Sequence, residues 1–494
     1  MKNIVVLLLA ALLITGCTQS TTITDDTQTQ SADPGTETAA ETDAEDPNDS
    51  LFRITAEDHS EQTVTILCSD THNYEFLAPE QNLDLINDAV YARNRAVEEL
   101  LEIDLEVISR PGAYDGGERE AFWTLISGSI MAGDGAYDIV CSMVSCMQMY
   151  ATPEYYMDIN MLEDVTLSNP WWVTEMKESL NVQGKLLSVI GDMNLSMYQK
   201  FAVTYANLDI LEKNGVSSDS LYSIVSDGSW TFEKLFSYSK GMEQDLNGDG
   251  SIDPMTDMVG LNIDSVPFWT VQASFDLPMI TLDEQGMPYT VGLTDRFAYA
   301  ADFLASNIHN NPAIAITDAD NNYTSDELVR SFAEERSVFL IGSLNAVEQM
   351  RDMESDFTIL PIPKLDDEQD VYRTLIATST HMTYVPVTTM DPSLTGKTLE
   401  SLAYYSYKMV VPAYYETALK ERYSRDVNTK VMLELIREHA VLPFEYAYST
   451  ALDWPHTVLA NAILNNTSGK LASTIESSVK LWNKRIEKLN ETFE

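Results

Sequence analysis

The chain has 494 residues, and its 77 Asp and Glu against 30 Lys and Arg give a formal net charge of −47. An acidic excess of this size repels phosphate backbones, so the composition excludes nucleic acid as a partner. With 44% hydrophobic residues the chain can still bury a large interior, and its length predicts two lobes or domains.

The N-terminus has the pattern of an exported lipoprotein. Lys2 precedes an uninterrupted apolar run from Ile4 to Ile14, which is too short to span a bilayer and indicates a signal peptide over residues 1–16. The run ends in Ile14-Thr15-Gly16-Cys17, which resembles the bacterial lipobox. We therefore expect lipidation of Cys17 and attachment to the extracytoplasmic side of the cell membrane. The alternative is an ordinary secreted protein in which Cys17 is incidental.

Residues 17–50 are predicted to be a disordered tether. The stretch from Thr18 to Ser50 contains nine acidic residues and no basic one. Such a segment cannot bury apolar area, and its charges repel one another. We expect it to be extended and to connect the lipidated cysteine to the folded part of the chain.

Strands and helices alternate in the next hundred residues. Strand patterns cover Thr63–Cys68, Leu105–Ile108 and Tyr137–Val140, and helical patterns cover Leu83–Leu101 and Arg119–Met131. Crossovers of this kind predict an α/β fold with a parallel sheet. Ligands bind outside the carboxyl ends of such strands, so the loops 69–74 and 141–145 become candidate cleft loops.

The remaining chain is predicted to be mixed and then rich in helices. We expect strands at 184–189, 201–205, 337–341 and 357–360, and helices from residue 208 and over 231–241. Cys68, Cys141 and Cys146 are expected in the core. The sequence leaves open whether two of them form a disulfide.

A short acidic loop has the spacing of a calcium site. Oxygen donors at positions 1, 3 and 5, a Gly at position 6 and a carbonyl at position 7 are typical of loops that wrap Ca²⁺. The expected ligands of a structural calcium ion away from the cleft are Asp245, Asn247, Asp249, Ser251 and Asp253. Position 12 is Thr256 in place of Glu, and Asp257 follows it. The alternative is a metal-free turn rich in Asp, Asn and Gly.

Catalytic patterns are missing from the sequence. It contains no Gly-x-Ser-x-Gly, no His-Glu-x-x-His, no phosphate-binding glycine loop and no zinc spacing. These absences favour a protein that is not an enzyme. Aromatic residues provide the other candidates, since their rings either stack on sugars or fill the core. They are Trp171, Trp172, Phe268, Trp269, Tyr414, Tyr415, Tyr446, Tyr448 and Trp454.

Several segments, taken in order, carry a family resemblance. They are Tyr91 to Glu99, Tyr137-Asp138-Ile139-Val140, Ser168-Asn169-Pro170-Trp171-Trp172, Tyr205-Ala206-Asn207, Ser229 to Leu235, the Asp245 loop and Phe357 to Lys364. Together with the lipobox and the acidic tether, they resemble the extracellular solute-binding lipoproteins of bacterial ABC importers, the family that includes maltose-binding proteins.

The resemblance implies an α/β, two-lobed periplasmic-binding-protein-like fold with a hinge and an interlobe cleft. One lobe would comprise residues 51–160 plus 372–440, and the other 161–371 plus 441–494. A monomer of this kind captures a small solute, most often a carbohydrate, and delivers it to an ABC permease without chemical change. The alternatives are a membrane-anchored enzyme acting on glycans and an adhesive or sensory lipoprotein with the same fold.

The cleft residues follow from the candidate loops and from the resemblance. The expected ligand contacts are Asp70, His72, Asn73, Ser142, Gln199, Trp269 and Asn345. The sequence Gly342-Ser343-Leu344-Asn345 departs from the maltose-binding pattern, because it lacks the Trp that stacks on sugars. A maltodextrin is therefore not the expected ligand.

Overall fold

The structure is a computed structural model that describes residues 46–309, 311–317, 323–419 and 427–493. The chain divides into two units, Met1–Asp49 and Ser50–Glu494, and the second holds all the sheets described below. The predicted signal peptide, Cys17 and the tether up to residue 45 lie outside the described residues. The last residues of the predicted tether form a short 3-10 helix, Pro47–Leu51, in place of extended chain.

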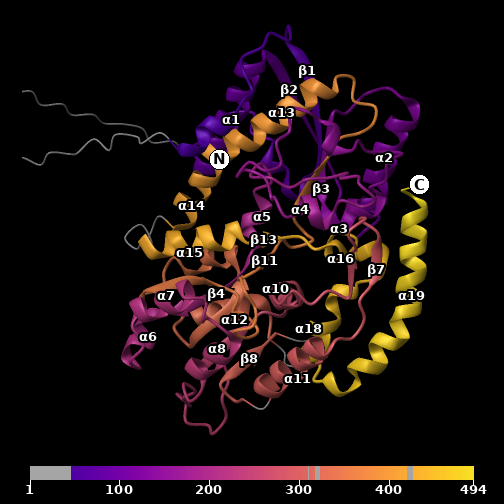
Figure 1. Cartoon of the computed structure of the whole chain (residues 1–494). Coiled ribbons are helices and arrows are strands. Elements are labelled where there is room, and N and C mark those ends of the chain that lie inside the picture. Colours follow the sequence, from indigo (N-terminus) through magenta and orange to yellow (C-terminus); the bar gives the residue numbers. More distant parts are fainter. Residues whose placement is uncertain (1–45, 310, 318–322, 420–426, 494) are drawn as a thin grey trace, which may run out of the picture. The chain divides into compact units, whose positions relative to one another are not determined.

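The first sheet has four strands in the order β12-β3-β1-β2. Strand β1 (Gln62–Ser69) lies between β2 (Ile103–Arg110) and β3 (Ile139–Met143) and is parallel to both, while β12 (His381–Tyr384) is antiparallel to β3. The predicted alternation is confirmed, with helix α1 at Leu85–Leu101 and α2 at Glu118–Ala132 (Figure 1). Asp84 begins α1, because its side chain accepts the Asn87 N–H.

The second sheet has five strands in the order β10-β4-β9-β5-β8. They are β4 (Ala202–Asn207), β5 (Val259–Ile263), β8 (Ile314–Ile316), β9 (Ser337–Ser343) and β10 (Phe357–Pro361). Strand β4 is antiparallel to both of its neighbours, whereas β5 is parallel to β8 and β9. Two small sheets pair β11 (Thr374–Leu375) with β13 (Ala440–Val441) and β6 (Ile280–Leu282) with β7 (Pro288–Thr290).

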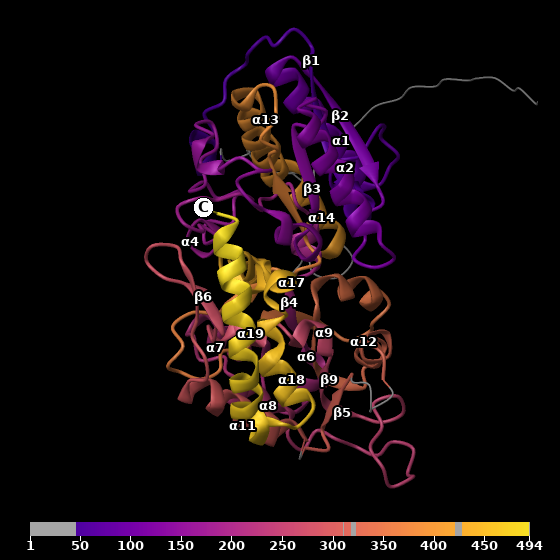
Figure 2. The ribbon, with the colours of Figure 1, turned by 90° about the vertical axis from the view of Figure 1, so that its right-hand side faces the viewer.

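Helices and short turns cover the rest of the chain. The α-helices are α3 (Val144–Met147), α4 (Met176–Ser179), α5 (Ser196–Gln199), α6 (Leu208–Lys213), α7 (Ser218–Ser226), α8 (Phe232–Ser239), α9 (Ser265–Phe268), α10 (Val271–Ser274), α11 (Asp295–His309), α12 (Ser325–Ala333), α13 (Pro392–Tyr405), α14 (Val411–Leu419), α15 (Val427–Glu438), α16 (Phe444–Ala447), α17 (Ser449–Leu452), α18 (Val458–Leu464) and α19 (Leu471–Glu491). The 3-10 turns are η2 (Asp70–Glu75), η3 (Gln148–Tyr150), η4 (Ile159–Met161), η5 (Leu344–Met350), η7 (Pro455–Thr457) and η8 (Ser468–Lys470), and η6 (Ser406–Val410) is a π-helix. Figure 2 shows α19 running past α17, and α19 contacts both α17 and β7.

The segment between the two sheets was predicted wrongly as a strand at 184–189. It forms only isolated bridges, Val182 with Lys185 and Val189 with Thr383 of β12. From Val189 the chain leaves the first sheet and enters the second at Ala202, so we name residues 190–201 the crossing segment. The buried run begins inside the predicted strand, at residue 186, and continues to Tyr198, so residues 186–189 have an apolar pattern without regular strand pairing.

A buried carboxylate holds part of the core together. Glu400 of α13 accepts hydrogen bonds from Trp171 Nε1 at 3.0 Å, Trp172 Nε1 at 2.9 Å and Asn169 Nδ2 at 2.7 Å. Both indole rings are buried, so they fill the core and do not present a face to a sugar. Burial raises the pKa of Glu400.

Two further findings concern the core and the lobes. Cys68, Cys141 and Cys146 are buried with free thiols, as expected for core residues.

Helix α15, which lies inside the range predicted for the first lobe, packs against β10 of the second sheet. The lobe boundaries themselves stay a prediction. Among the described residues, no helix has the length and apolar character needed to cross a membrane.

Candidate functional site

The carboxyl ends of three strands meet at one edge of the first sheet. Ser69 of β1 is paired with Arg110 of β2, and Cys68 is paired with Cys141 of β3. The chain continues from these ends into η2, into the loop that carries Tyr114, and into α3. In the second sheet, α9 follows the carboxyl end of β5 and η5 follows that of β9. The loops that carry Asp70, Trp269 and Asn345 therefore follow strand ends of the kind at which α/β folds bind ligands.

Turn η2 contains three of the predicted contacts. Asp70 is exposed, and His72 and Asn73 are half-buried. Asn73 Nδ2 donates to Ser109 Oγ at 3.1 Å, and His72 Nε2 lies 2.9 Å from the Ser379 carbonyl oxygen. Burial lowers the pKa of His72, which favours the neutral imidazole. These bonds fix the two side chains beside the exposed Asp70 carboxylate.

Tyr74 connects η2 to helix α5, which carries the predicted ligand contact Gln199. Its hydroxyl donates to Gln199 Oε1 on α5 and lies 3.3 Å from His72 Nδ1. Burial and the carboxylate of Glu75 raise the pKa of Tyr74, and Glu348 of η5 adds to the effect. The structure thus brings His72 and Gln199 together, and η5, which carries the half-buried Asn345, contacts the helix α5 that holds Gln199.

The other two predicted contacts lie apart from this group. Ser142 is fully buried in β3, and its hydroxyl has no hydrogen-bond partner among the described residues. In this conformation it does not reach solvent. Trp269 follows α9 and is 41% exposed, so its ring is free to meet a ligand. Its carbonyl oxygen accepts the Tyr446 hydroxyl at 3.1 Å.

A row of aromatic residues links the two sheet edges, and the sequence did not predict it as a unit. We name Tyr446, His456, Trp454 and Tyr114 the aromatic row. The Tyr446 and His456 rings are 4.3 Å apart, His456 and Trp454 are 5.6 Å apart, and Trp454 and Tyr114 are 6.0 Å apart. Tyr446 bonds to Trp269 beside the second sheet, whereas Tyr114 follows β2 of the first.

The backbone at Trp454 is strained. Asp453 and Trp454 both have left-handed conformations, with φ of +67° and +56°. Positive φ is rare for a bulky side chain, and such strain is concentrated at functional positions. Here it presents the half-buried Trp454 ring to Tyr114, whose other neighbour is the Arg119 guanidinium at 4.7 Å from the ring centre. Aromatic faces at this edge are suited to stack on a flat apolar ring.

Two buried titratable groups lie at the aromatic row, and one of them, Glu445, anchors it. Glu445 accepts hydrogen bonds from Gln272 Nε2 at 2.7 Å and from the Met279 and Ile280 N–H groups at 2.9 Å, and burial raises its pKa to about 7. Burial lowers the pKa of His456 to about 3, and its Nδ1 has no partner among the described residues. The row is therefore anchored from α16 to α10 and β6.

The remaining aromatic candidates are core residues. Phe268, Tyr414, Tyr446 and Tyr448 are all buried. Tyr415 is half-buried and packs edge-on against Tyr198. Among the nine aromatic candidates, Trp269 and Trp454 are thus the ones whose rings combine exposure with a position at the sheet edges.

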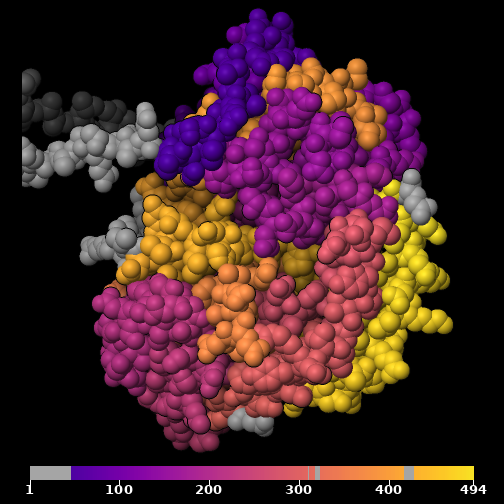
Figure 3. All heavy atoms as spheres, in the orientation of Figure 1, coloured from indigo at the N-terminus to yellow at the C-terminus, as the bar shows by residue number. Residues whose placement is uncertain are grey.

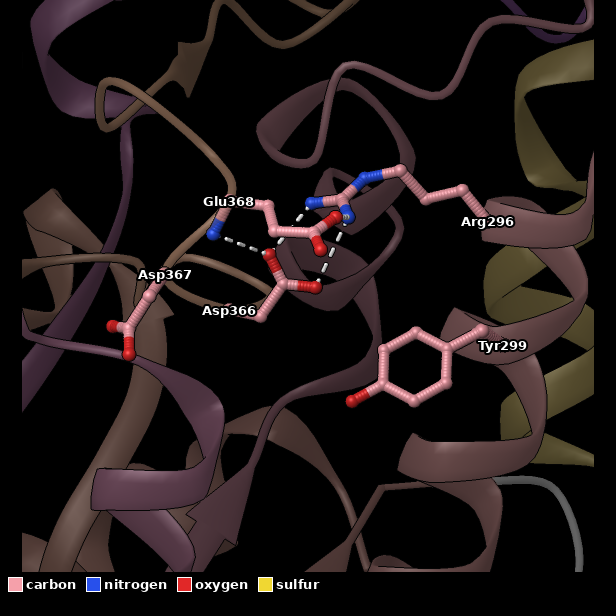
Figure 4. A pocket seen from close by; sticks show the side chains of 5 residues that line it. All are labelled: Arg296, Tyr299, Asp366, Asp367 and Glu368. Carbon is pink, nitrogen blue, oxygen red and sulfur yellow. Dashed lines mark hydrogen bonds and ion pairs between the residues drawn. The ribbon is translucent and has the colours of Figure 1, made fainter.

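An open pocket of about 560 Å³ lies between α11 and the segment after β10. Arg296 donates to both carboxylate oxygens of Asp366, at 2.8 and 3.1 Å, and to Glu368 at 3.0 Å (Figure 4). Asp367 points away from the guanidinium, and Tyr299 lines the other side. Figure 3 shows the orange segment around residue 365 beside the salmon segment around residue 290. Its arginine is already paired with two carboxylates, and none of its lining residues is among the predicted ligand contacts, so we do not assign it as the ligand site.

The predicted calcium loop is closed by its own hydrogen bonds. Asp245 accepts the N–H groups of Gly248 and Gly250, and Asp249 accepts that of Ser251. The buried Asp257 accepts the N–H groups of Leu246, Asn247 and Asp253. Across the part of the chain that the structure describes, no three His, Cys, Asp or Glu side chains converge as metal ligands. Calcium binding at this loop stays a prediction.

Comparison with known proteins gives the fold. No protein-family model and no curated protein sequence matches the chain. Among solved structures, maltose-bound MalE3 of T. maritima is similar with a TM-score of 0.50 and 16% identity, covering 86% of this chain and 99% of that one. A cyclo/maltodextrin-binding protein complexed with maltotetraose has a TM-score of 0.52 and 10% identity, with 86% and 97% covered.

A third solved structure agrees with these two. The GacH receptor of Streptomyces glaucescens, solved unliganded and with acarbose, has a TM-score of 0.50 and 13% identity, with 86% of this chain and 99% of that chain covered. Identities this low establish the fold alone. The chain therefore has the two-lobed, periplasmic-binding-protein-like α/β fold of the maltose-binding type.

Proposed function

We propose that the chain is a non-enzymatic solute-binding protein that captures a carbohydrate between its lobes and delivers it to an ABC permease. The observation that carries this proposal is the aromatic row, which begins at Tyr446, bonded to the carbonyl oxygen of the exposed Trp269, and ends at Tyr114 after β2. In solved proteins of the same fold, the bound molecules are maltose, maltotetraose and acarbose.

The side chains at the two sheet edges suit a sugar. The exposed Trp269 and the half-buried Trp454 offer apolar faces for a pyranose ring. Asp70, Asn73 and Gln199 supply the carboxylate and amide groups that bond to sugar hydroxyls. Stacking combined with a few placed polar groups is the usual composition of a small-molecule site.

One arrangement bears on the alternative of a glycan-active or other enzyme. Ser69 Oγ lies 2.8 Å from His381 Nε2, and His381 Nδ1 lies 2.9 Å from Glu75 Oε2, which is the connectivity of a Ser-His-acid triad. All three side chains are fully buried, and the Ser69 hydroxyl also bonds to Thr71 Oγ1 at 2.7 Å. A nucleophile must reach its substrate, so this burial supports the binding protein over the enzyme.

The proposal includes the anchor. The lipobox that ends in Cys17 supports a mature chain that is lipidated at this residue, lies outside the cytoplasm and keeps the binding lobes near the membrane. The acidic stretch after Cys17 supports a flexible connection of the kind that charged linkers provide.

The test is a thermal-shift screen followed by calorimetry. The probes are maltose, maltotetraose, acarbose and ribitol, and a ligand that binds only the folded state raises the melting temperature once its concentration exceeds Kd. We expect at least one sugar to bind with unchanged covalent structure when the mixture is analysed by mass spectrometry. Failure of every carbohydrate in a wide panel, or release of cleaved sugar, would contradict the proposal.

A further inference from the structure

The crossing segment is tied to the predicted ligand loop by one buried carboxylate. Glu75 is the last residue of η2, and its side chain is fully buried. Glu75 Oε1 accepts the backbone N–H of Ser196 at 2.6 Å. Ser196 is the first residue of α5 in the crossing segment, so this bond joins the loop after β1 to the chain that leads into the second sheet.

A second contact closes the same group. The backbone N–H of His381, where β12 begins, donates to Ser196 Oγ at 3.0 Å. His381 Nδ1 lies 2.9 Å from Glu75 Oε2, and its Nε2 lies near the hydroxyls of Ser69 and Thr71. Glu75 and Ser196 therefore connect β1, the crossing segment and β12 at one point.

Polar and charged groups from three elements surround Glu75. From α1, the buried Arg93 donates through NH2 to the Glu75 carbonyl oxygen at 2.8 Å. His381 faces the carboxylate from β12, and the half-buried His72 lies on the same turn, with its ring 4.9 Å from that of His381. A carboxylate removed from water in this way requires such partners. Burying a carboxylate costs free energy, so we expect Glu75 to have a role other than filling space in the core.

We propose that Glu75 is a positioning residue for ligand binding: by accepting the Ser196 N–H it holds the loop Asp70–Tyr74 against the crossing segment and so couples ligand contact in that loop to the movement of the lobes. The inference rests on the proposed function. Tyr74 supports it, because its hydroxyl donates to Gln199 on the same short helix α5. The loop with the exposed Asp70 is thus bonded to α5 at both ends of that helix.

Three variants of the mature chain separate this role from mere stability. Glu75→Leu removes the acceptor and leaves the buried Ser196 N–H unpaired. Glu75→Gln keeps an acceptor oxygen of the same reach and should restore the bond. Glu400→Leu is the matched control, because it also removes a buried carboxylate that accepts several N–H bonds, but it lies among Trp171 and Trp172 and not at the crossing segment.

The first readout needs no ligand. Hydrogen exchange of the Ser196 amide should be roughly tenfold faster or more in Glu75→Leu, near wild type in Glu75→Gln and unchanged in Glu400→Leu. If Glu75→Leu does not fold, Glu75→Asp takes its place, since it keeps the carboxylate but is one methylene shorter, no longer reaches the Ser196 N–H and should speed exchange of that amide. Equal exchange in all variants, or equal acceleration by Glu400→Leu, would overturn the proposal.

The second readout is affinity for maltotetraose, or for the sugar that the screen identifies. Glu75→Leu should weaken binding by about tenfold, while Glu75→Gln and Glu400→Leu should bind as the wild type does. Loss of affinity equal in Glu75→Leu and Glu400→Leu would assign Glu75 a purely structural role. If the wild type binds no sugar, the proposed function fails, whereas the exchange comparison still decides whether Glu75 holds the crossing segment.

Discussion

The buried carboxyl group of Glu445, which anchors the aromatic row, should make the stability of the protein depend on pH. Its carboxyl group is fully buried, and burial raises its pKa from 4.5 to about 7 in spite of the three N–H groups that donate to it. Because the pKa is higher in the folded protein, the unfolded chain loses its proton first as the pH rises. The free energy of unfolding that depends on Glu445 is therefore fully present below pH 4.5 and is lost between pH 4.5 and about 7.

The magnitude follows from the shift. A displacement of roughly two and a half pH units corresponds to about 3 kcal/mol of unfolding free energy. In Glu445→Gln this titration is removed, so the difference between wild type and variant should change by about that amount between pH 4.5 and pH 7.5, in favour of the variant as the pH rises. Urea unfolding followed by tryptophan fluorescence at several pH values measures the difference.

Comparing wild type with Glu445→Gln isolates the contribution of Glu445 to the pH dependence from that of other titratable groups. The depressed pKa of His456 acts in the opposite direction, since stability from that residue is lost as the pH falls below 6.5, but it is common to both proteins and cancels. Parallel pH profiles, with a difference constant to within about 1 kcal/mol, would refute the reasoning, because a carboxyl group with an ordinary pKa contributes no slope in this range.

Four further predictions address binding, stability, the loop and the anchor. Trp454→Ala should weaken sugar binding by about tenfold, because a stacked aromatic contributes about 0.5 to 1.5 kcal/mol beyond its area, and calorimetry that finds an unchanged Kd would exclude the ring from the site. Glu400→Leu should lower the unfolding free energy by at least about 3 kcal/mol in urea titration, since buried N–H groups are left unpaired, and a loss below about 1 kcal/mol would contradict this. Calcium added to dialysed protein should raise the melting temperature of wild type but not of a variant with Asp245→Ala and Asp249→Ala, and no shift in either protein would remove the calcium prediction. Cys17→Ala should release the protein from membranes in a fractionation assay, and continued membrane attachment with normal processing would show that Cys17 is not the anchor.

The fold was predictable where the pattern is local. The strand at Thr63–Cys68 and the apolar stripe of α1 have clear periods, and the structure confirms both. The strand expected at 184–189 failed because burial on all sides gives an apolar run without strand pairing. Sequence patterns record burial, and residues 186–189 are buried although they form only an isolated bridge.

The candidate site was predictable only in its loops. The position of η2 at a strand end follows from the β-α alternation, and so does the exposure of Asp70. The pairing of Tyr114 with Trp454 depends on a left-handed backbone at Trp454 and on chain segments far apart in sequence, and no local signal marks either. The same holds for Glu75 and His381, which meet only because β12 joins the first sheet.

The place of β12 in the first sheet also has a consequence for biosynthesis. Strand β3 pairs on one side with β1, which is close in sequence, and on the other with β12 at His381–Tyr384. Until residue 384 has emerged from the ribosome, that edge of β3 has no strand to pair with. Unpaired edges template association between chains. Chains truncated after β3 but before β12 should therefore aggregate. A chaperone that prevents this would have to cover the free edge of β3 until β12 has been synthesised.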